Sequence, residues 1–135
     1  MAILKSETLP LRASEEIVPA RQAVRRWAVE LGFGLVDQTK IVTAASELAR
    51  NTVIHGGGGA VTLEALNEGG KRGLRLTFVD EGPGIPDIQS ALRDGFTTGG
   101  GLGLGLGGAK RLSNEFELRS GPGQGTRVTI TRWRA

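Results

Sequence analysis

The sequence contains no cysteine and a single histidine among its 135 residues. The absence of cysteine excludes a disulfide framework and a thiolate metal site, and one histidine is too few for the usual zinc sites. The sequence also lacks a secretory leader and any stretch of about 20 apolar residues. We therefore expect a cytoplasmic protein without a membrane span.

Aromatic residues are scarce, at 4% of the chain, which argues against nucleic acid as a partner. The net charge is +3, but the 17 lysines and arginines are scattered along the sequence. Near the end, Arg127, Arg132 and Arg134 are more typical of a solvated face than of a DNA-binding patch. Hydrophobic residues make up 39%, as in globular chains, and we predict a single domain over residues 1–135.

Glycine is abundant, with 22 residues, and it gathers in a run over 99–108 that alternates with leucine. Ordering such a run costs backbone entropy, so it indicates a place where the backbone approaches another group closely. Peptide N–H groups that lead into a helix suit phosphate oxygens, and residues 109–116 can continue as that helix. The alternative is a flexible linker, against which the leucines of the run would need a buried position.

Two common phosphate loops do not fit this run. A P-loop needs Lys and then Ser or Thr directly after its last glycine, where this chain has Ala109 and Lys110. A dinucleotide fingerprint can be drawn through Gly103, Gly105 and Gly108, but no strand precedes it. The run therefore predicts a phosphate loop of another kind.

The spacing of apolar residues predicts the elements of the fold. Strands are predicted over 3–11, 61–65, 74–79, 116–119 and 127–133, helices over 14–31, 37–55 and 102–114, a hairpin turn over 67–72, and a short helix and loop over 87–96. Ser14 and Asp37 are predicted to cap the long helices, and Gly32 to end the first. Because the helices cluster, we predict an α/β (α+β) two-layer sandwich, with a mixed or antiparallel sheet and helices on one face.

On the second helix, Glu47, Asn51 and His55 are spaced by four residues and share one face. Mg²⁺ prefers hard oxygen ligands and keeps several waters, so the Asn51 amide oxygen could hold it together with triphosphate oxygens. Taken alone, Asn51 would be a solvent-facing helix residue, and His55 is more typical of a structural histidine than of a phospho-acceptor. The buried side of this helix is predicted to comprise Ile41, Ala44, Ala45, Leu48, Ala49 and Thr52.

A second cluster follows the strand over 74–79, where Asp80 is succeeded by Gly82 and Gly84. A carboxylate at a strand end can accept a hydrogen bond from the exocyclic amine of adenine, and glycines let the backbone approach a flat base. Asp80 could equally be a turn residue. Thr126 could bond the base directly or through water, or be an ordinary strand residue.

Together these segments resemble the GHKL (Bergerat) ATP-binding fold of histidine kinases, gyrase-type ATPases and small bacterial Ser/Thr switch kinases. Residues 47–51, 80–85 and 101–105 match its N, G1 and G2 boxes in order, and the resemblance covers about residues 8–134. It implies ATP and Mg²⁺ as cofactors, with Asn51 as the Mg²⁺ ligand, Asp80 at adenine, and Gly101, Gly103 and Gly105 at the phosphates. The chemistry of Gly82, Gly84 and Thr126 adds these residues to the adenine site. It also favours Glu47 as general base over a salt bridge with Arg50 or a surface charge.

The length of 135 residues leaves no room for the phospho-accepting helices of a histidine kinase or the further domain of a gyrase-type ATPase. The chain therefore resembles the free-standing switch kinases, and among them the kinases of the bacterial stressosome. This resemblance implies phosphorylation of STAS-domain proteins on Ser or Thr, followed by release and activation of a PP2C-type phosphatase. The alternatives are an anti-sigma factor of the same fold that phosphorylates its antagonist, and a binding module that has lost catalysis.

Overall fold

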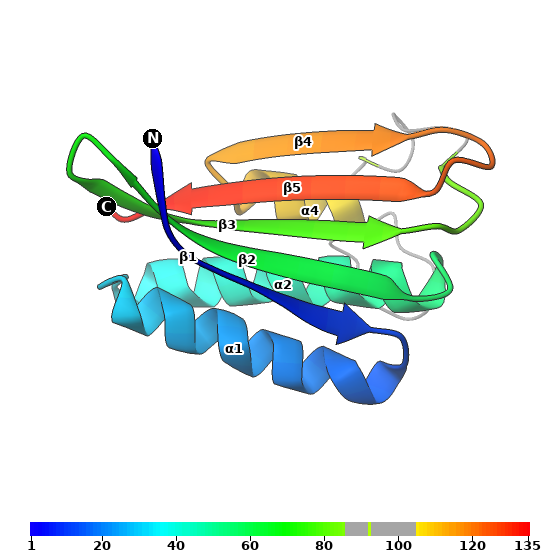
Figure 1. Cartoon of the computed structure of the whole chain (residues 1–135), viewed down its shortest axis with the longest axis horizontal. Helices are drawn as coiled ribbons and strands as arrows, with labels where there is room; N and C mark the ends of the chain where they lie inside the picture. Colours follow the sequence, from blue (N-terminus) through cyan, green and yellow to red (C-terminus); the bar gives the residue numbers. More distant parts are fainter. Residues whose placement is uncertain (86–91, 93–104) are drawn as a thin grey trace.

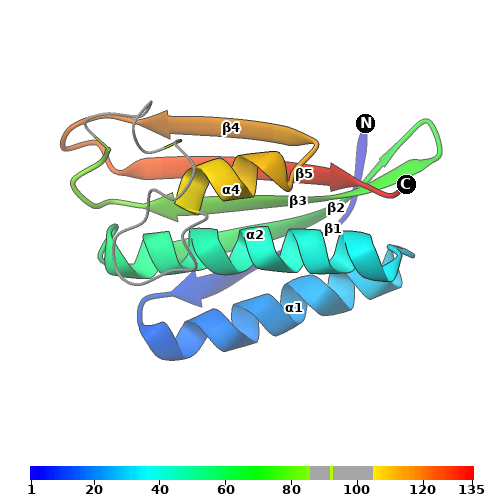
Figure 2. The same cartoon turned by 180° about the vertical axis from the view of Figure 1, so that it is seen from behind.

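The computed structural model describes residues 1–85, 92 and 105–135. Its elements are β1 (Ala2–Leu11), the 3-10 turn η1 (Ser14–Glu16), α1 (Ile17–Glu30), α2 (Leu35–Ile54), β2 (Gly59–Glu68), β3 (Lys71–Asp80), α4 (Gly105–Arg111), β4 (Glu115–Ser120) and β5 (Thr126–Trp133). The strands form a five-stranded sheet in the order β1-β2-β3-β5-β4, and each neighbouring pair is antiparallel. Figures 1 and 2 show α1, α2 and α4 on one face of this sheet. The predicted two-layer α+β sandwich is confirmed, and its sheet is antiparallel rather than mixed.

The core lies between the helices and the covered face of the sheet. Leu74, Leu76 and Phe78 alternate along β3 and are at most 2% exposed, whereas Arg75 between them points to the open face. The predicted buried side of α2 is confirmed at every position, and Trp27 of α1 is a core residue. These packed side chains hold α2 firmly against the strands that carry the polar residues discussed below.

The helix starts differ from the prediction. Ser14 opens η1 without capping it, and the Glu16 carboxylate accepts the backbone N–H of Arg12 instead, at 2.7 Å. Gly34 occupies the N-cap position of α2, so Asp37 lies within the first turn of that helix. Both predicted side-chain caps were wrong: Ser14 and Asp37 each lie within the helical turn rather than before it, and the Asp37 carboxylate accepts a hydrogen bond from Arg132. Gly32 does end α1, with a positive φ of 85°.

The hairpin between β2 and β3 is tighter than the predicted turn over 67–72. The strands continue to Glu68 and from Lys71, so only Gly69 and Gly70 connect them, with φ of 59° and 84°. Two residues with positive φ give the turn whose twist matches the flanking strands, and glycine adopts that backbone without strain. The predicted helix over 102–114 is described from Gly105 and ends at Arg111, and the predicted helix and loop over 87–96 lie almost wholly outside the described residues.

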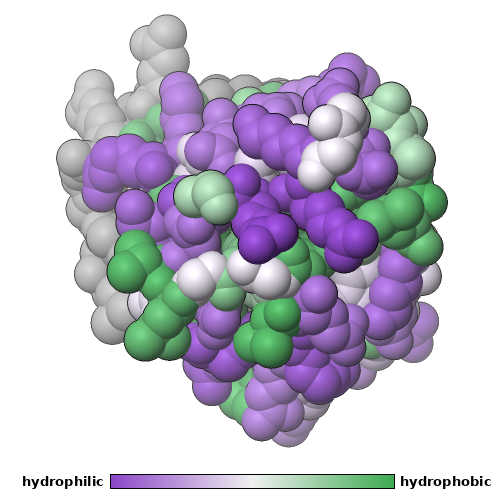
Figure 3. All heavy atoms as spheres, turned by 90° about the vertical axis from the view of Figure 1, so that its left-hand side faces the viewer, coloured by the Kyte–Doolittle hydropathy of each residue, from purple (hydrophilic) through white to green (hydrophobic). Residues whose placement is uncertain are grey.

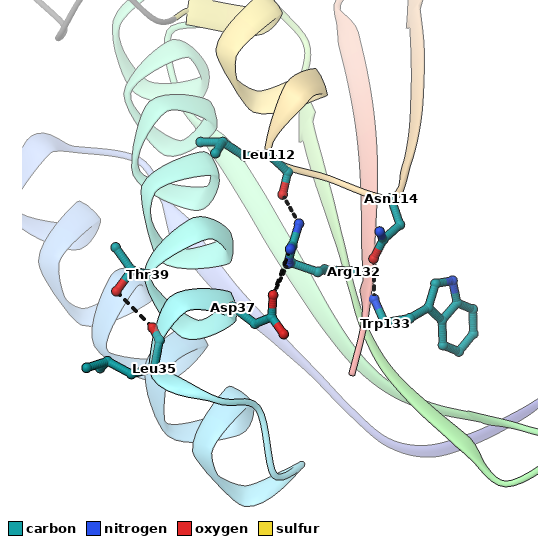
Figure 4. A network of polar contacts seen from close by, with 7 residues as sticks. All are labelled: Leu35, Asp37, Thr39, Leu112, Asn114, Arg132 and Trp133. Carbon is teal, nitrogen blue, oxygen red and sulfur yellow. Dashed lines mark hydrogen bonds and ion pairs between the residues drawn. The ribbon is translucent and has the colours of Figure 1, made fainter. Parts of the chain in front are cut away.

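A half-buried ion pair ties α4 to the start of α2 (Figure 4). Arg132 of β5 donates from Nη2 to Asp37 Oδ1 at 2.7 Å and from Nη1 to the Leu112 carbonyl at 2.8 Å. The Arg132 and Asp37 side chains are only 12% and 16% exposed. One guanidinium therefore fixes the end of α4 against both α2 and the sheet.

Figure 3 views the end of the molecule at which both termini and the β2–β3 hairpin lie. Exposed hydrophobic residues include Val29 at the end of α1 and Leu35 and Val36 at the start of α2. Hydrophobic side chains appear on this face as separate patches between hydrophilic ones (Figure 3). Within residues 1–85, 92 and 105–135, no helix is long and apolar enough to cross a membrane.

Candidate functional site

Three polar residues form a row across the end of the sheet opposite the termini. Asp80 ends β3 and pairs in register with Thr126 at the start of β5, which pairs with Ser120 at the end of β4. Phe78 and Val128, two positions away on their strands, are buried in the core. Because side chains two apart share a face, the row belongs to the face that the helices cover.

Backbone from three other segments approaches Asp80 so closely that only glycine fits. A Cβ on Gly56, just after α2, would overlap the Asp80 carboxyl group, and one on Gly125 would overlap the Asp80 carbonyl oxygen. A Cβ on Gly82 would lie 2.7 Å from the Gly56 Cα. The end of α2, the loop after β3 and the turn before β5 therefore pack together around Asp80 (Figure 1).

The Asp80 carboxylate is partly withdrawn from water. Its Oδ1 accepts the backbone N–H of Gly82 at 2.9 Å. Burial raises the pKa of Asp80 above its ordinary value of 3.8, and the N–H groups of Gly82 and Thr126 and the charge of His55 oppose that rise. Burial dominates, so a further hydrogen-bond donor from a ligand would relieve the cost of keeping this group ionised.

The loop over 81–85 is held against the turn between β4 and β5. The Gly123 N–H donates to the Pro83 carbonyl at 2.8 Å, and the Ile85 N–H donates to Ser120 Oγ at 2.8 Å. Gly84, with a φ of 81°, packs against the Gly121 carbonyl where a side chain would collide. The predicted residues Gly82 and Gly84 thus lie in a loop with a fixed backbone path beside Asp80.

Sequence reasoning missed Ser120 and Gly56. Ser120 has no motif around it, and only the pairing register of β4 with β5 brings it next to Thr126. Gly56 opens a visible run of four glycines, but its contact is with Asp80, 24 positions later in the sequence. One signal could have suggested this contact: a helix that ends in several glycines, followed later in the sequence by a strand that ends in Asp–x–Gly.

The two predicted residues of α2 lie one turn apart. Glu47 is 4% exposed, so the alternative of a surface charge is wrong. Asn51 is half-buried, and its carbonyl accepts the N–H groups of both His55 and Gly56 at 3.0 Å. Since Gly56 touches Asp80, the end of α2 that carries Asn51 is anchored beside the row. His55 is exposed.

Of the predicted phosphate contacts, Gly101 and Gly103 lie outside the described residues. Gly105 is buried and opens α4 with a φ of 54°. Leu106 and Ala109 of α4 belong to the same core as α2, and Figure 2 shows the two helices next to each other. The glycine run therefore ends against the helix that carries Glu47 and Asn51.

The side chains that the structure describes in this region are too few to bind a metal ion by themselves. Among the described residues, no group of three or more His, Cys, Asp or Glu side chains could hold a metal ion. A cation here would need oxygens from a ligand in addition to the Asn51 amide. A pocket of about 170 Å³ at this end of the sheet is smaller than typical ligand pockets of about 300–1,000 Å³. It is lined by Val79, Asp80, Arg119, Ser120, Gln124, Thr126 and Arg127. Because Val79, Arg119 and Arg127 alternate with the row along their strands, this pocket reaches the open face of the sheet.

Comparison with known proteins gives these features a context. Residues 36–134 match the family of histidine kinase-, DNA gyrase B-, and HSP90-like ATPases. The chain is 52% identical over 118 residues to the serine/threonine-protein kinase RsbT of Bacillus subtilis, which spans 87% of this chain and 89% of that protein. It is 34% identical over 120 residues to an anti-sigma F factor of Thermoanaerobacter sp., with coverage of 84% and 82%.

Solved structures share the fold. The RsbU and RsbW domains of a Mycobacterium tuberculosis protein match with a TM-score of 0.64 and 24% identity, over 100% of this chain and 34% of that one. The SiaB–SiaC complex of Pseudomonas aeruginosa matches with a TM-score of 0.52 and 16% identity, over 97% and 90%.

Proposed function

Because the chain belongs to the histidine kinase-, DNA gyrase B- and HSP90-like ATPase family and is a serine/threonine-protein kinase, we propose that it phosphorylates STAS-domain proteins of a bacterial partner-switching stress pathway. The observation that carries this proposal is the 52% identity to RsbT over 87% of the chain. The identity to an anti-sigma F factor is lower, at 34%. It supports a partner-switching pathway as well, but it favours sigma-factor binding less than the 52% identity favours a kinase like RsbT.

In this proposal ATP binds at the row formed by Asp80 and Thr126, with the backbone at Gly82 and Gly84 against the base. The close glycine contacts around Asp80 support it, because they bring the backbone at the end of α2 and in the turn before β5 against this residue with no side chain between them. The glycine run, with Gly101, Gly103 and Gly105, would contact the phosphates. Asn51 would give a side-chain oxygen to Mg²⁺, which when bound neutralises phosphate charge.

Glu47 is proposed as the general base. Its burial at 4% exposure, one helical turn before Asn51, suits a carboxylate that acts in a water-poor site rather than on the surface. In the transfer, the Ser or Thr oxygen of the acceptor bonds to the γ-phosphorus and the bond to the ADP oxygen breaks. The hydroxyl proton passes to the Glu47 carboxylate.

The proposed output is a switch in partners. The cytoplasmic kinase, folded as one domain over 1–135, would be held by its STAS substrates, released by phosphorylating them, and free to activate a PP2C-type phosphatase. An anti-sigma factor would instead bind a sigma factor tightly while its antagonist is phosphorylated. The two are separated by which protein the chain retains after phosphotransfer.

A radiolabelled ATP–Mg²⁺ transfer assay with co-encoded STAS-domain proteins tests the proposal. We expect acid-stable label on a Ser or Thr, lost in Glu47→Gln. Glu117→Gln is the matched control, because Glu117 lies on β4 with a side chain that is 62% exposed. If the unchanged protein transfers no label but binds the same acceptors tightly, the proposal that it phosphorylates STAS-domain proteins is refuted. That result would favour a binding module.

A further inference from the structure

Ser120 uses its whole hydrogen-bonding capacity on three neighbouring groups. A hydroxyl has one proton to donate and two lone pairs to accept with. Ser120 Oγ lies 2.8 Å from the Gly125 carbonyl, 2.8 Å from the Ile85 N–H nitrogen and 3.0 Å from Thr126 Oγ1. The carbonyl can only accept, so Ser120 is the donor in that hydrogen bond. The N–H can only donate, so Ser120 is the acceptor from Ile85.

The donor in the third contact follows from this count. Ser120 gives its single proton to the Gly125 carbonyl, so in the 3.0 Å contact with Thr126 the donor is the threonine hydroxyl. The Thr126 proton is thereby committed to Ser120, and its oxygen keeps only lone pairs for anything else. Asp80, its partner in register, is a carboxylate whose oxygens also only accept.

We propose that Ser120 is a positioning residue for base specificity: by taking the Thr126 proton, it makes the wall formed by Asp80 and Thr126 a wall of acceptors. This inference rests on the proposed ATP site. Such a wall attracts the exocyclic amine of adenine, a donor. It repels a carbonyl oxygen at the same ring position, as in hypoxanthine or guanine, because the facing groups are then acceptors on both sides.

The same serine also holds the loop over 81–85 through the Ile85 N–H. Loss of that bond would loosen the loop for every nucleotide alike. ATP and ITP differ in the exocyclic group and at ring N1, which carries a proton only in hypoxanthine. Since loss of loop support affects both nucleotides alike, the ratio of their affinities separates the polarity of the wall from simple support of the loop.

The experiment measures the Kd of ATP and ITP, each with Mg²⁺, by calorimetry. The unchanged protein is expected to prefer ATP, and Ser120→Ala to reduce that preference about tenfold, the effect of one hydrogen bond of reversed polarity. Ser120→Thr, which retains the hydroxyl, should restore it. An equal loss of ATP and ITP affinity in Ser120→Ala would overturn the inference and leave only loop support.

Variants of Thr126 test the inference without touching Ser120. Thr126→Val should lower the ATP preference, Thr126→Ser should keep it, and Ser120→Ala added to Thr126→Val should change the ratio no further. A further drop in that double variant would contradict action through Thr126. If the unchanged protein binds ATP and ITP equally, the polarity inference fails while the ATP site stands. If it binds neither nucleotide, both fail.

Discussion

Asp80→Asn should weaken ATP binding by about 10- to 150-fold. Asp80 Oδ1 already accepts the Gly82 N–H at 2.9 Å, so the amide oxygen of Asn is expected to keep that place. The amide NH₂ then replaces the acceptor oxygen that would face the adenine amine, and a donor meets a donor. A hydrogen bond to a charged group contributes about 1.5–3 kcal/mol, which converts to that range of affinity.

The same substitution should not lower stability at neutral pH. Burial raises the pKa of Asp80 in the folded state above 3.8, so the folded protein binds this proton more tightly than the unfolded chain does. The stability that this tighter binding contributes is complete below 3.8 and is lost as pH rises through the folded-state pKa. An uncharged Asn avoids that loss, so the variant should gain stability relative to the unchanged protein between a pH just below 3.8 and neutral pH.

Two measurements on the same samples decide the matter. Calorimetry gives the Kd of ATP, and urea unfolding at both pH values gives the free energy of unfolding. Glu117→Gln serves again as a control that removes one exposed carboxylate of β4. Unchanged ATP affinity in a folded Asp80→Asn protein would remove Asp80 from the nucleotide site, and reduced stability that is independent of pH would refute the burial argument.

Three further substitutions test other parts of the structure. Asn51→Ala should abolish phosphotransfer with the fold intact, since Asn51 is only half-buried, and Asn67→Ala on β2 is its control; normal transfer would exclude the proposed Mg²⁺ ligand. Gly56→Ala should cost about 1–3 kcal/mol in urea unfolding because its Cβ meets Asp80. Gly34→Ala has nothing within 4 Å and should cost less, about 0.5 kcal/mol, from the loss of the N-cap glycine alone. Arg132→Met should cost about 3 kcal/mol by leaving Asp37 buried without its partner; a cost under about 1 kcal/mol would mean the pair stabilises little.

Local patterns in the sequence were enough to predict most of the fold. The stripe on α2 and the alternation along β3 could be predicted because burial on one face imposes a period of 3.6 or of 2 on the residues themselves. Gly32 and the glycines of the hairpin were visible for a similar reason, since a positive φ selects glycine locally. Glu47, Asn51 and Asp80 could be proposed because their residue types and spacings suit phosphate and base chemistry.

The wrong helix caps show where local patterns stop. Asp37 has the composition of a cap, but its carboxylate is bound by Arg132, 95 positions later in the sequence. A charge-assisted pair in a half-buried place outweighs the cap bond that the same oxygen could make to an exposed N–H. No residue near Asp37 in the sequence indicates that Arg132 is its partner, because Arg132 reaches Asp37 only through the pairing of β5 with β3.

The row at the sheet end extends this reasoning to specificity. Asp80 and Thr126 are chemically suggestive on their own, but a threonine hydroxyl can donate or accept, so its residue type leaves its preference for a base undecided. The preference is decided by Ser120, which reaches Thr126 only through the antiparallel register of β4 and β5. Sequence motifs thus indicate which groups face a ligand. Whether such a group donates or accepts a hydrogen bond is determined by its partners in the fold, which strand pairing brings next to it.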